Sequence, residues 1–579
     1  MKNFRLVLPA LLIALAIAAR VIPGPRTIDD AYITFRYARN LLAGQGFVYN
    51  PGEAVLGTTT PLYTLLLAGL GASTGGPQAP FPELAMWVNA LADAATCLLL
   101  WSLGRRLGLG RAGAAAALAW AVAPFSVTFA IGGLETSVFI ALLSGAVWAA
   151  AHSYRRPGEA DGERVRWRVL AAWLASLALL TRPDALILLG PLALERLWSA
   201  LPRRMAGGRG ERFHPAELAA AVLPYGAWAV YATLIFGSPL PHSILAKAAA
   251  YQLGTGDGLI RLLQHYATPF LEQNLLGTPL AVGLGLVLYP FLFILGARRV
   301  VRAEPRLLAW ALYPWLYLIT FALANPLIFR WYLTPPLPAY FFFIFVGLEG
   351  VLARLGKKMR GDTVTMETRR HGKKKALCPQ NGDSKRESEG GIPKIGPPWS
   401  AGALRGAMRL LGVTPWGRFV VPVLLAVPIL FSLTEWRPSL DHGGTQPAPE
   451  MAFIKLELLY RQAAERMAPQ LTPQSVLAAG DVGVLGYFTP ARILDTVGLN
   501  SPVSTGYYPL PADQYVINYA VPAGLIVDQR PDWVVILEVY GRRSLLLDSR
   551  FQAEYHLVEK IETDLYGSDG MLIFQRNPL

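Results

Sequence analysis

Apolar runs of membrane-spanning length recur along this chain of 579 residues, and they constrain its fold more than any other feature. Runs of roughly 17–25 apolar residues are long enough to cross a hydrocarbon core of about 30 Å. Backbone groups in lipid must be satisfied within their own segment, so each run has to be a helix. The mean hydropathy of +0.36 is too apolar for a soluble protein of this size. We therefore predict a mostly α-helical, polytopic membrane protein with about 11 transmembrane helices.

The net charge of +14 is concentrated in short loops between the apolar runs. This is the positive-inside pattern, so nucleic acid is not needed as a partner to explain the charge. With Lys2 and Arg5 in the cytoplasm, we favour an uncleaved first helix over a signal peptide. The short run Pro61–Leu70 is then expected at the outer interface or re-entering the membrane. The loops predicted to be cytoplasmic hold Arg105, Arg106 and Arg111; Arg155, Arg156, Arg164, Arg166 and Arg168; Arg203, Arg204, Arg209 and Arg212; and Arg298, Arg299, Arg302 and Arg306.

The composition divides the chain into two predicted domains. Residues 1–435 form a transmembrane domain, whose first outer loop is 23–60. A basic insert rich in Gly, Pro and Ser, at about 357–400, is expected to be disordered in the cytoplasm near anionic lipid. Residues 436–579 have ordinary composition and are expected to form an extracytoplasmic α/β domain. Its predicted elements are a helix at Met451–Met467 and strands at Ser475–Ala479, Arg492–Thr496, Trp533–Leu537 and Met571–Phe574.

The first outer loop carries a pattern that suggests chemistry. Asp29 and Asp30 stand where a helix would begin, and Gly44 where it would end. Helical spacing puts Arg36 on the same face as Asp29, roughly 10 Å away. The carboxylate can act on a hydroxyl or hold a metal, and the guanidinium can grip a phosphate. Alternatively, an Asp caps the helix and Arg36 touches lipid headgroups.

Residues 29–67 also resemble a known family. The double Asp is followed by Tyr-x-x-x-Arg-Tyr-x-x-Asn, Gly-x-Gly, Tyr-Asn-Pro-Gly-Glu and Thr-Thr-Pro-Leu-Tyr. This ordered set resembles the first outer loop of GT-C glycosyltransferases, and it is most similar to that of the bacterial terminal arabinofuranosyltransferase branch. The many-span layout and the outer C-terminal domain are similar to that family in arrangement only.

The resemblance implies an integral-membrane glycosyltransferase of the cytoplasmic membrane. Such an enzyme transfers a sugar, arabinofuranose or another pentose or hexose, from a polyprenyl-phosphate donor to an extracytoplasmic glycan, lipid or protein acceptor. In the family an acidic residue of this loop is catalytic, so the resemblance implies that Asp29 or Asp30 is the general base. A divalent cation (Mg²⁺, Mn²⁺ or Ca²⁺) held by Asp29 and Asp30 stays an alternative. The seven His show no zinc-ligand spacing.

Further candidates lie at the predicted outer ends of the spans. Glu135, in Gly132-Gly133-Leu134-Glu135-Thr136, is either a second acid of the site or a turn residue. Arg182 and Asp184 are favoured as a local ion pair. Asp481 follows a predicted strand, where Asp is common for backbone reasons, and it is a candidate for acceptor binding.

Four more residues are candidates for the donor phosphate. The loop Gly237–Lys247 resembles a family loop near the donor, so His242 or Lys247 can meet the phosphate, although an interfacial Lys is often a membrane anchor. Arg330, between Phe329 and the pair Trp331-Tyr332, is a positive charge on the outer side and runs against the charge bias. Phosphate binding by Arg330 and Tyr332 is favoured over anchoring in the aromatic belt.

Two other classes of protein fit part of the pattern. A transporter or flippase of lipid-linked sugars would also have many spans, but it should carry ionisable residues near mid-membrane. A non-catalytic envelope assembly protein would keep the fold without needing Asp29 and Asp30.

Overall fold

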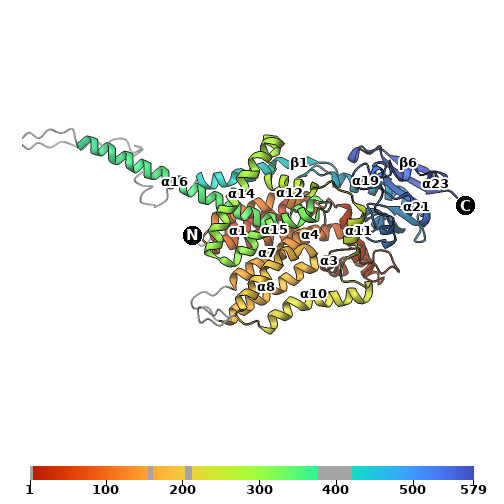
Figure 1. Ribbon diagram of the computed structural model, residues 1–579, viewed down its shortest axis with the longest axis horizontal. Coiled ribbons are helices and arrows are strands. Elements are labelled where there is room, and N and C mark those ends of the chain that lie inside the picture. Colours follow the sequence, from red (N-terminus) through yellow and green to blue (C-terminus); the bar gives the residue numbers. More distant parts are fainter. Residues whose placement is uncertain (1–3, 154–160, 202–210, 376–419, 579) are drawn as a thin grey trace, which may run out of the picture.

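The computed structural model describes residues 4–153, 161–201, 211–375 and 420–578, and it is mostly helical. Long helices lie side by side across the body of the molecule, with the N-terminus at one end and the C-terminal part at the other (Figure 1). These helices are α1 (Phe4–Val21), α4 (Phe81–Arg106), α5 (Gly110–Val122), α6 (Pro124–Ile131), α7 (Thr136–His152), α8 (Asp161–Thr181), α9 (Leu186–Ala200), α10 (Pro215–Phe236), α14 (Thr278–Ala303), α15 (Leu308–Ala324), α16 (Leu337–Lys375) and α18 (Val421–Ser432).

Within the described ranges, five helices are long and apolar enough to cross a membrane, or six if the bent pair α5–α6 is one span. The helices α1, α7 and α18 are apolar but shorter. The expectation of a mostly helical chain with several apolar helices is therefore confirmed, and the number eleven stays a prediction. The helix α16 continues to Lys375, so the first part of the insert expected to be disordered is helical. The remainder of that insert, up to residue 400, lies outside the described residues.

The long helices pack closely where their facing residues are small. A Cβ added to Gly296 of α14 would overlap the carbonyl of Phe343 in α16, and one added to Gly347 would overlap that of Leu292. Such close approach lets helices pack tightly in a membrane, where no hydrophobic force holds them together.

Arg20 of α1 and Asp93 of α4 form a fully buried ion pair at 2.9 Å. The two side chains make further hydrogen bonds with Trp120, Ser126 and Ser137 and with main-chain carbonyls. Because these partners satisfy both charges, the pair fixes how α1 lies against α4.

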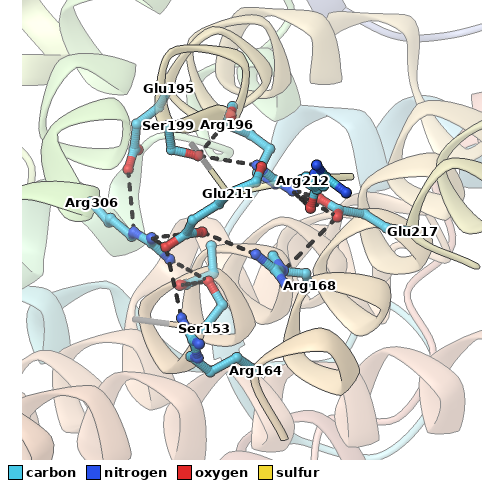
Figure 2. A network of polar contacts seen from close by, with 11 residues as sticks. Ser153, Arg164, Arg168, Glu195, Arg196, Ser199, Glu211, Arg212, Glu217 and Arg306 are labelled. Carbon is cyan, nitrogen blue, oxygen red and sulfur yellow. Dashed lines mark hydrogen bonds and ion pairs between the residues drawn. The ribbon is translucent and has the colours of Figure 1, made fainter. Parts of the chain in front are cut away.

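A second polar network joins α8, α9 and α10 at their ends away from the C-terminal part (Figure 2). Arg196 donates to both oxygens of Glu217, at 2.6 and 3.0 Å. Glu211 accepts from Arg168 at 3.0 Å and from Arg306 at 3.3 Å. The network holds the start of α10, which packs mainly on α8 and otherwise exposes apolar side chains.

Shorter segments cover the other end of the long helices. They are α2 (Asp29–Leu42), α3 (Pro61–Thr74), α11 (His242–Ala250), α12 (Asp257–Ala267), α13 (Gln273–Leu276) and the 3-10 turn η4 (Arg330–Leu333). The helix expected from Asp29 to about Gly44 is confirmed, and α3 extends the run expected at Pro61–Leu70.

The C-terminal part is built on a five-stranded sheet of order β4-β3-β5-β7-β6, with a separate hairpin of β1 (Trp436–Ser439) and β2 (Gln446–Pro449). The strands β3, β4 and β5 are parallel, whereas β7 runs antiparallel to β5 and to β6. The bounds are β3 (Val476–Ala479), β4 (Arg492–Asp495), β5 (Trp533–Leu537), β6 (Tyr555–Ile561) and β7 (Met571–Arg576), with helices α19 (Ala452–Met467), α20 (Gly483–Phe488), α21 (Ala523–Gln529), α22 (Glu538–Gly541) and α23 (Ser549–Glu554). All four expected strands are present.

One hydrophobic core runs from the first outer loop into this C-terminal part. Phe35 and Tyr37 of α2 belong to the same buried cluster as Leu477 of β3 and Val535 of β5. The domain boundary predicted at 435/436 stays a prediction, and packing continues across it. Residues of α2 thus share a core with the sheet, and α2 packs against its helix α20.

Candidate active site

A cavity of about 240 Å³ lies between the short segments at this end of the helical part and the C-terminal sheet. Asp30 and Trp331 line it from the helical part, and Asp481, Val497 and Tyr540 line it from the other side. These last three residues follow directly after β3, β4 and β5. Open α/β sheets bind their ligands outside the carboxyl ends of parallel strands, so the cavity has the position of a binding site.

The two neighbouring aspartates of α2 have different surroundings. The carboxylate of Asp29 is buried and accepts hydrogen bonds from the amides of Gly483, at 2.9 Å, and Val484, at 2.7 Å. Burial raises the pKa of Asp29, and the charges of Asp481 and Asp30 raise it further. The side chain of Asp30 is 34% exposed, and its nearest cation is the ammonium of Lys247 at 4.0 Å. Asp30 therefore presents the free carboxylate.

The contact of Asp29 depends on a glycine at the start of α20. A Cβ on Gly483 would overlap the main-chain carbonyl of Asp29. Glycine lets the two backbones approach until the amides of α20 reach the carboxylate. A carboxylate at a helix N-terminus is a favourable pairing, and here it joins α2 to the C-terminal sheet.

Arg36 lies on the same face of α2 as Asp29, but it does not reach the cavity. Its guanidinium is buried and donates to the carbonyls of Gly486, at 2.7 Å, and Ala491, at 3.2 Å, and it lies over the ring of Tyr49. Its contacts are made with the C-terminal part and with Asn50 and Tyr49, and it does not line the cavity, so its binding of a donor phosphate stays a prediction. Arg36 connects two distant parts of the chain.

Asp481 adds a third carboxyl group to this end of the molecule. Its Oδ2 accepts a hydrogen bond of 2.9 Å from the hydroxyl of Tyr460, in α19. Burial raises the pKa of Asp481 to about 7, and the charges of Asp30 and Asp495 act in the same direction. Asp481 thus faces the cavity, as its candidacy for ligand contact requires.

Lys247 lies beside the cavity rather than at a free membrane surface. Its ammonium stands 5.0 Å from the ring centre of Phe329, besides its pairing with Asp30. Burial acts to lower the pKa of Lys247, but Tyr332, Asp30 and Glu135 outweigh it and the pKa is raised. The ammonium therefore stays charged near Asp30.

Glu135, Arg182 and Asp184 form a closed cluster behind Lys247. Arg182 donates to both oxygens of Asp184 at 3.0 Å and to Glu135 at 3.2 Å, and it lies over the ring of Tyr332. The ion pair expected between Arg182 and Asp184 is confirmed. The charge of Glu135 is balanced by that of Arg182, so the cluster has a structural role next to the site.

Arg330 lines a second cavity, of about 650 Å³, which adjoins the first. Arg261 of α12 lines both cavities. Burial lowers the pKa of Arg261, and the charge of Arg330 lowers it further. Across the part of the chain that the structure describes, neither arginine has an ion pair. Sequence reasoning missed Arg261, although its predicted outer location is the same signal that singled out Arg330.

The remaining candidates receive less support. His242 lines neither of these two cavities; its main-chain N–H donates to the carbonyl of Leu56 at 2.8 Å. Over the described ranges, no group of three or more His, Cys, Asp or Glu side chains is arranged to hold a metal ion. Both oxygens of Asp29 are already used by backbone amides.

Comparisons with known proteins agree with this geometry. Residues 452–574 match a family described as a domain of unknown function, DUF8728. A terminal beta-(1->2)-arabinofuranosyltransferase of Mycobacterium tuberculosis (strain ATCC 25618 / H37Rv) is 31% identical over 274 residues, which are 45% of this chain. The match covers only 40% of that relative's length.

The fold is similar to that of ArnT from Cupriavidus metallidurans. The apo crystal structure of ArnT gives a TM-score of 0.56 at 14% identity, covering 100% of this chain and 99% of that one. The ArnT structure bound to undecaprenyl phosphate gives 0.54 at 13% identity and covers 100% of both chains. The resemblance predicted from the first outer loop is thereby confirmed: the chain has the fold of the GT-C glycosyltransferase ArnT and is similar in sequence to a terminal arabinofuranosyltransferase.

Proposed function

We propose that this chain is an integral-membrane glycosyltransferase. It moves a sugar, arabinofuranose or another pentose or hexose, from a polyprenyl-phosphate donor to a hydroxyl group of an extracytoplasmic cell-envelope acceptor. The observation that carries the proposal is the partly exposed carboxylate of Asp30 in a cavity beside Arg261 and Arg330, which have no ion pair among the described residues, in a chain with the ArnT fold.

Asp30 is the proposed general base. An acceptor hydroxyl has a pKa far above 7, so a carboxylate within hydrogen-bond reach takes its proton as the new C–O bond forms. Asp29 cannot do this without giving up its bonds to Gly483 and Val484. The ammonium of Lys247, 4.0 Å from Asp30, gives that carboxylate a neighbour of opposite charge.

Arg261 and Arg330 are the proposed partners of the donor phosphate. Within the described ranges neither guanidinium group has an acidic partner, so the two repel each other, and an anion between them removes that repulsion. The leaving phosphate gains negative charge as the sugar departs, and fixed cations stabilise that change. Lys247, with Tyr332 near it, stands on the Asp30 side of the same cavity.

The first cavity suits a single sugar ring. Its volume of about 240 Å³ is below the roughly 300–1,000 Å³ of pockets for drug-sized ligands. Aromatic side chains, among them Trp331 and Tyr540, offer flat faces for a sugar to stack on, and Asp481 offers a polar contact. We assign this contact to the acceptor.

The charge pattern gives the proposed topology. Eleven spans put the N-terminus in the cytoplasm and the C-terminal sheet outside the cytoplasmic membrane, where a lipid-linked sugar reaches the cavity. A transporter should carry ionisable residues near mid-membrane that can meet its cargo. The buried charges Arg20 and Asp93 instead pair with each other and with neighbouring side chains, so the transport alternative is less well supported.

Purified protein in liposomes tests the proposal directly. Polyprenyl-phosphate donors carrying arabinofuranose, another pentose or a hexose are mixed with envelope glycan acceptors, and the glycan product is measured by mass spectrometry. We expect transfer from at least one donor, beginning with arabinofuranose because of the curated relative. Parallel reactions with Mg²⁺, Mn²⁺, Ca²⁺ or EDTA define the cation requirement.

Matched variants separate the enzyme from its rivals. Asp30→Asn should lower transfer at least about 10²-fold, whereas Asp513→Asn, at an exposed residue that lines neither cavity, should keep it. Movement of the lipid-linked sugar across the bilayer without product would support a flippase. Neither transfer nor movement would support a non-catalytic assembly protein.

A further inference from the structure

Two carboxyl groups line the first cavity from different parts of the chain. Asp30 comes from α2, and Asp481 from the loop after β3. Asp30 has a cation beside it, whereas Asp481 forms no ion pair within the described part of the chain. Environments that differ in this way commonly give two carboxyl groups different protonation states and different roles.

The hydrogen bond from Tyr460 distinguishes the two oxygens of Asp481. The Tyr460 hydroxyl donates to Oδ2 at 2.9 Å. Oδ1 has no hydrogen-bond partner among the described residues, and the side chain lines the cavity. If Asp481 carries a proton, Oδ1 is the oxygen that can donate it to a ligand while Oδ2 stays fixed.

The surroundings of Asp481 favour its neutral form. Burial raises its pKa to about 7, and Asp30 and Asp495 add to the effect, whereas the Tyr460 hydrogen bond opposes it. Arg261 is a cation that lines the same cavity. The titratable groups that line the cavity or interact with Asp481 are Asp29 and Asp30 of α2, Tyr251, Arg261 of α12, Tyr460 of α19, Asp495 at the end of β4, Tyr519, Tyr540 of α22 and Tyr566.

We infer that Asp481 is a positioning residue that acts in its protonated form. Its Oδ1–H donates a hydrogen bond to an oxygen of the acceptor sugar, and this contact turns the attacking hydroxyl toward Asp30. The inference rests on the proposed function, and it adds a residue of the C-terminal sheet to the site.

The transfer step leaves Asp481 chemically unchanged. The acceptor oxygen forms a bond to the anomeric carbon of the sugar and gives its proton to Asp30. The bond between that carbon and the phosphate oxygen breaks, and its electron pair stays on the phosphate, which gains one negative charge. A charged Asp481 would lose the donated hydrogen bond and add another negative charge beside Asp30 and the phosphate, so its deprotonation should slow the reaction.

The pH dependence of transfer tests this role. For the wild type, kcat/KM for the acceptor should fall about tenfold per pH unit above roughly pH 7, as expected for one group that must stay protonated. In Asp481→Asn the amide still donates but cannot lose a proton. Its kcat/KM for the acceptor should be lower by about three- to tenfold at pH 6, and the fall above pH 7 should disappear. The KM for the donor should stay constant.

A second variant keeps the inference testable even if Asp481→Asn fails to fold. Tyr460→Phe removes the hydrogen bond that favours the charged form, so the alkaline fall should move to higher pH. Asp513→Asn is the control, and its pH profile should match the wild type. An alkaline fall that persists in Asp481→Asn, or that moves to lower pH in Tyr460→Phe, would overturn the inference. Absence of transfer by the wild type with every donor would instead overturn the proposed function.

Discussion

Replacing Asp29 by Asn should loosen the junction between α2 and the C-terminal sheet. The Asp29 carboxylate accepts two buried amides, from Gly483 and Val484. The Asn side chain has one carbonyl oxygen, which can satisfy one amide, and its NH₂ group then faces the other. One buried donor therefore loses its partner.

The size of this loss follows from the two hydrogen bonds. An unsatisfied buried donor costs about 1–3 kcal/mol, and we expect about 2 kcal/mol for Asp29→Asn. Asp30→Asn removes only a partly exposed pairing with Lys247 at 4.0 Å, which is worth at most about 1 kcal/mol. If the outer loop and the sheet unfold as one unit of roughly 150–250 residues, 2 kcal/mol lowers the melting temperature by about 4–8 °C.

Thermal unfolding of the purified variants in one detergent measures this difference. Intrinsic Trp fluorescence should report a lower transition for Asp29→Asn and a transition within about 2 °C of the wild type for Asp30→Asn. Equal melting temperatures for Asp29→Asn and the wild type would refute the anchoring role of Asp29. A larger loss in Asp30→Asn would reverse the roles assigned to the two residues.

Three further predictions concern the same junction. The raised pKa of Asp481 means that its contribution to stability is present below about pH 4 and is lost as the pH rises through about 7. Asp481→Asn should therefore be more stable than the wild type at pH 8, by up to about 4 kcal/mol, and melts across pH should show this gain vanishing near pH 4. Gly483→Ala should destabilise the protein by roughly 1–3 kcal/mol, because the added methyl group would overlap Asp29. Gly506→Ala, at a glycine with open space around it, should leave the stability unchanged, and thermal melts of the two variants side by side check this. Arg36→Met should leave the carbonyl of Ala491 without its donor, leave that of Gly486 with only the longer bond from Arg39, and lower the melting temperature. The KM for the donor should stay unchanged in steady-state assays.

Local sequence patterns predicted the elements around the site well. The cap-like start at Asp29 and the helical spacing placed Asp29 and Arg36 on one face of α2, and the structure has them there. Short apolar runs bounded by turn residues predicted β3, β4, β5 and β7. The expectations did not include β6 or the β1–β2 hairpin; β6 is an edge strand with an exposed middle, so its pattern is weaker.

The roles of Asp29 and Arg36 could not be predicted, because their partners are more than 440 residues away in the chain. A buried Asp–amide contact and an exposed carboxylate look alike in a sequence. The difference between Asp29 and Asp30 arises only when Gly483 brings α20 against α2. Lys247 is likewise placed beside the cavity by its distance to Asp30. Sequence spacing does not predict a contact between residues so far apart in the chain.

The charge bias singled out one of the two arginines beside the cavities and missed the other. Arg330 stood out as a positive residue on the predicted outer side, and it lines the second cavity. Arg261 carries the same signal but lies in an amphipathic segment between spans, where a basic residue is easily taken for an interfacial anchor. Arg261 and Arg330 come to line one cavity only when the chain folds and brings α12 near the turn η4.

Single-turnover transfer at saturating donor tests the central claim most directly, which is that Asp30 takes the proton of the acceptor hydroxyl. The rate for Asp30→Asn should fall by about 10²–10⁴-fold relative to the wild type, with the affinity for the donor unchanged. Asp29→Asn, measured below its melting transition, should retain a far larger share of the rate. A rate for Asp30→Asn within tenfold of the wild type would contradict the account.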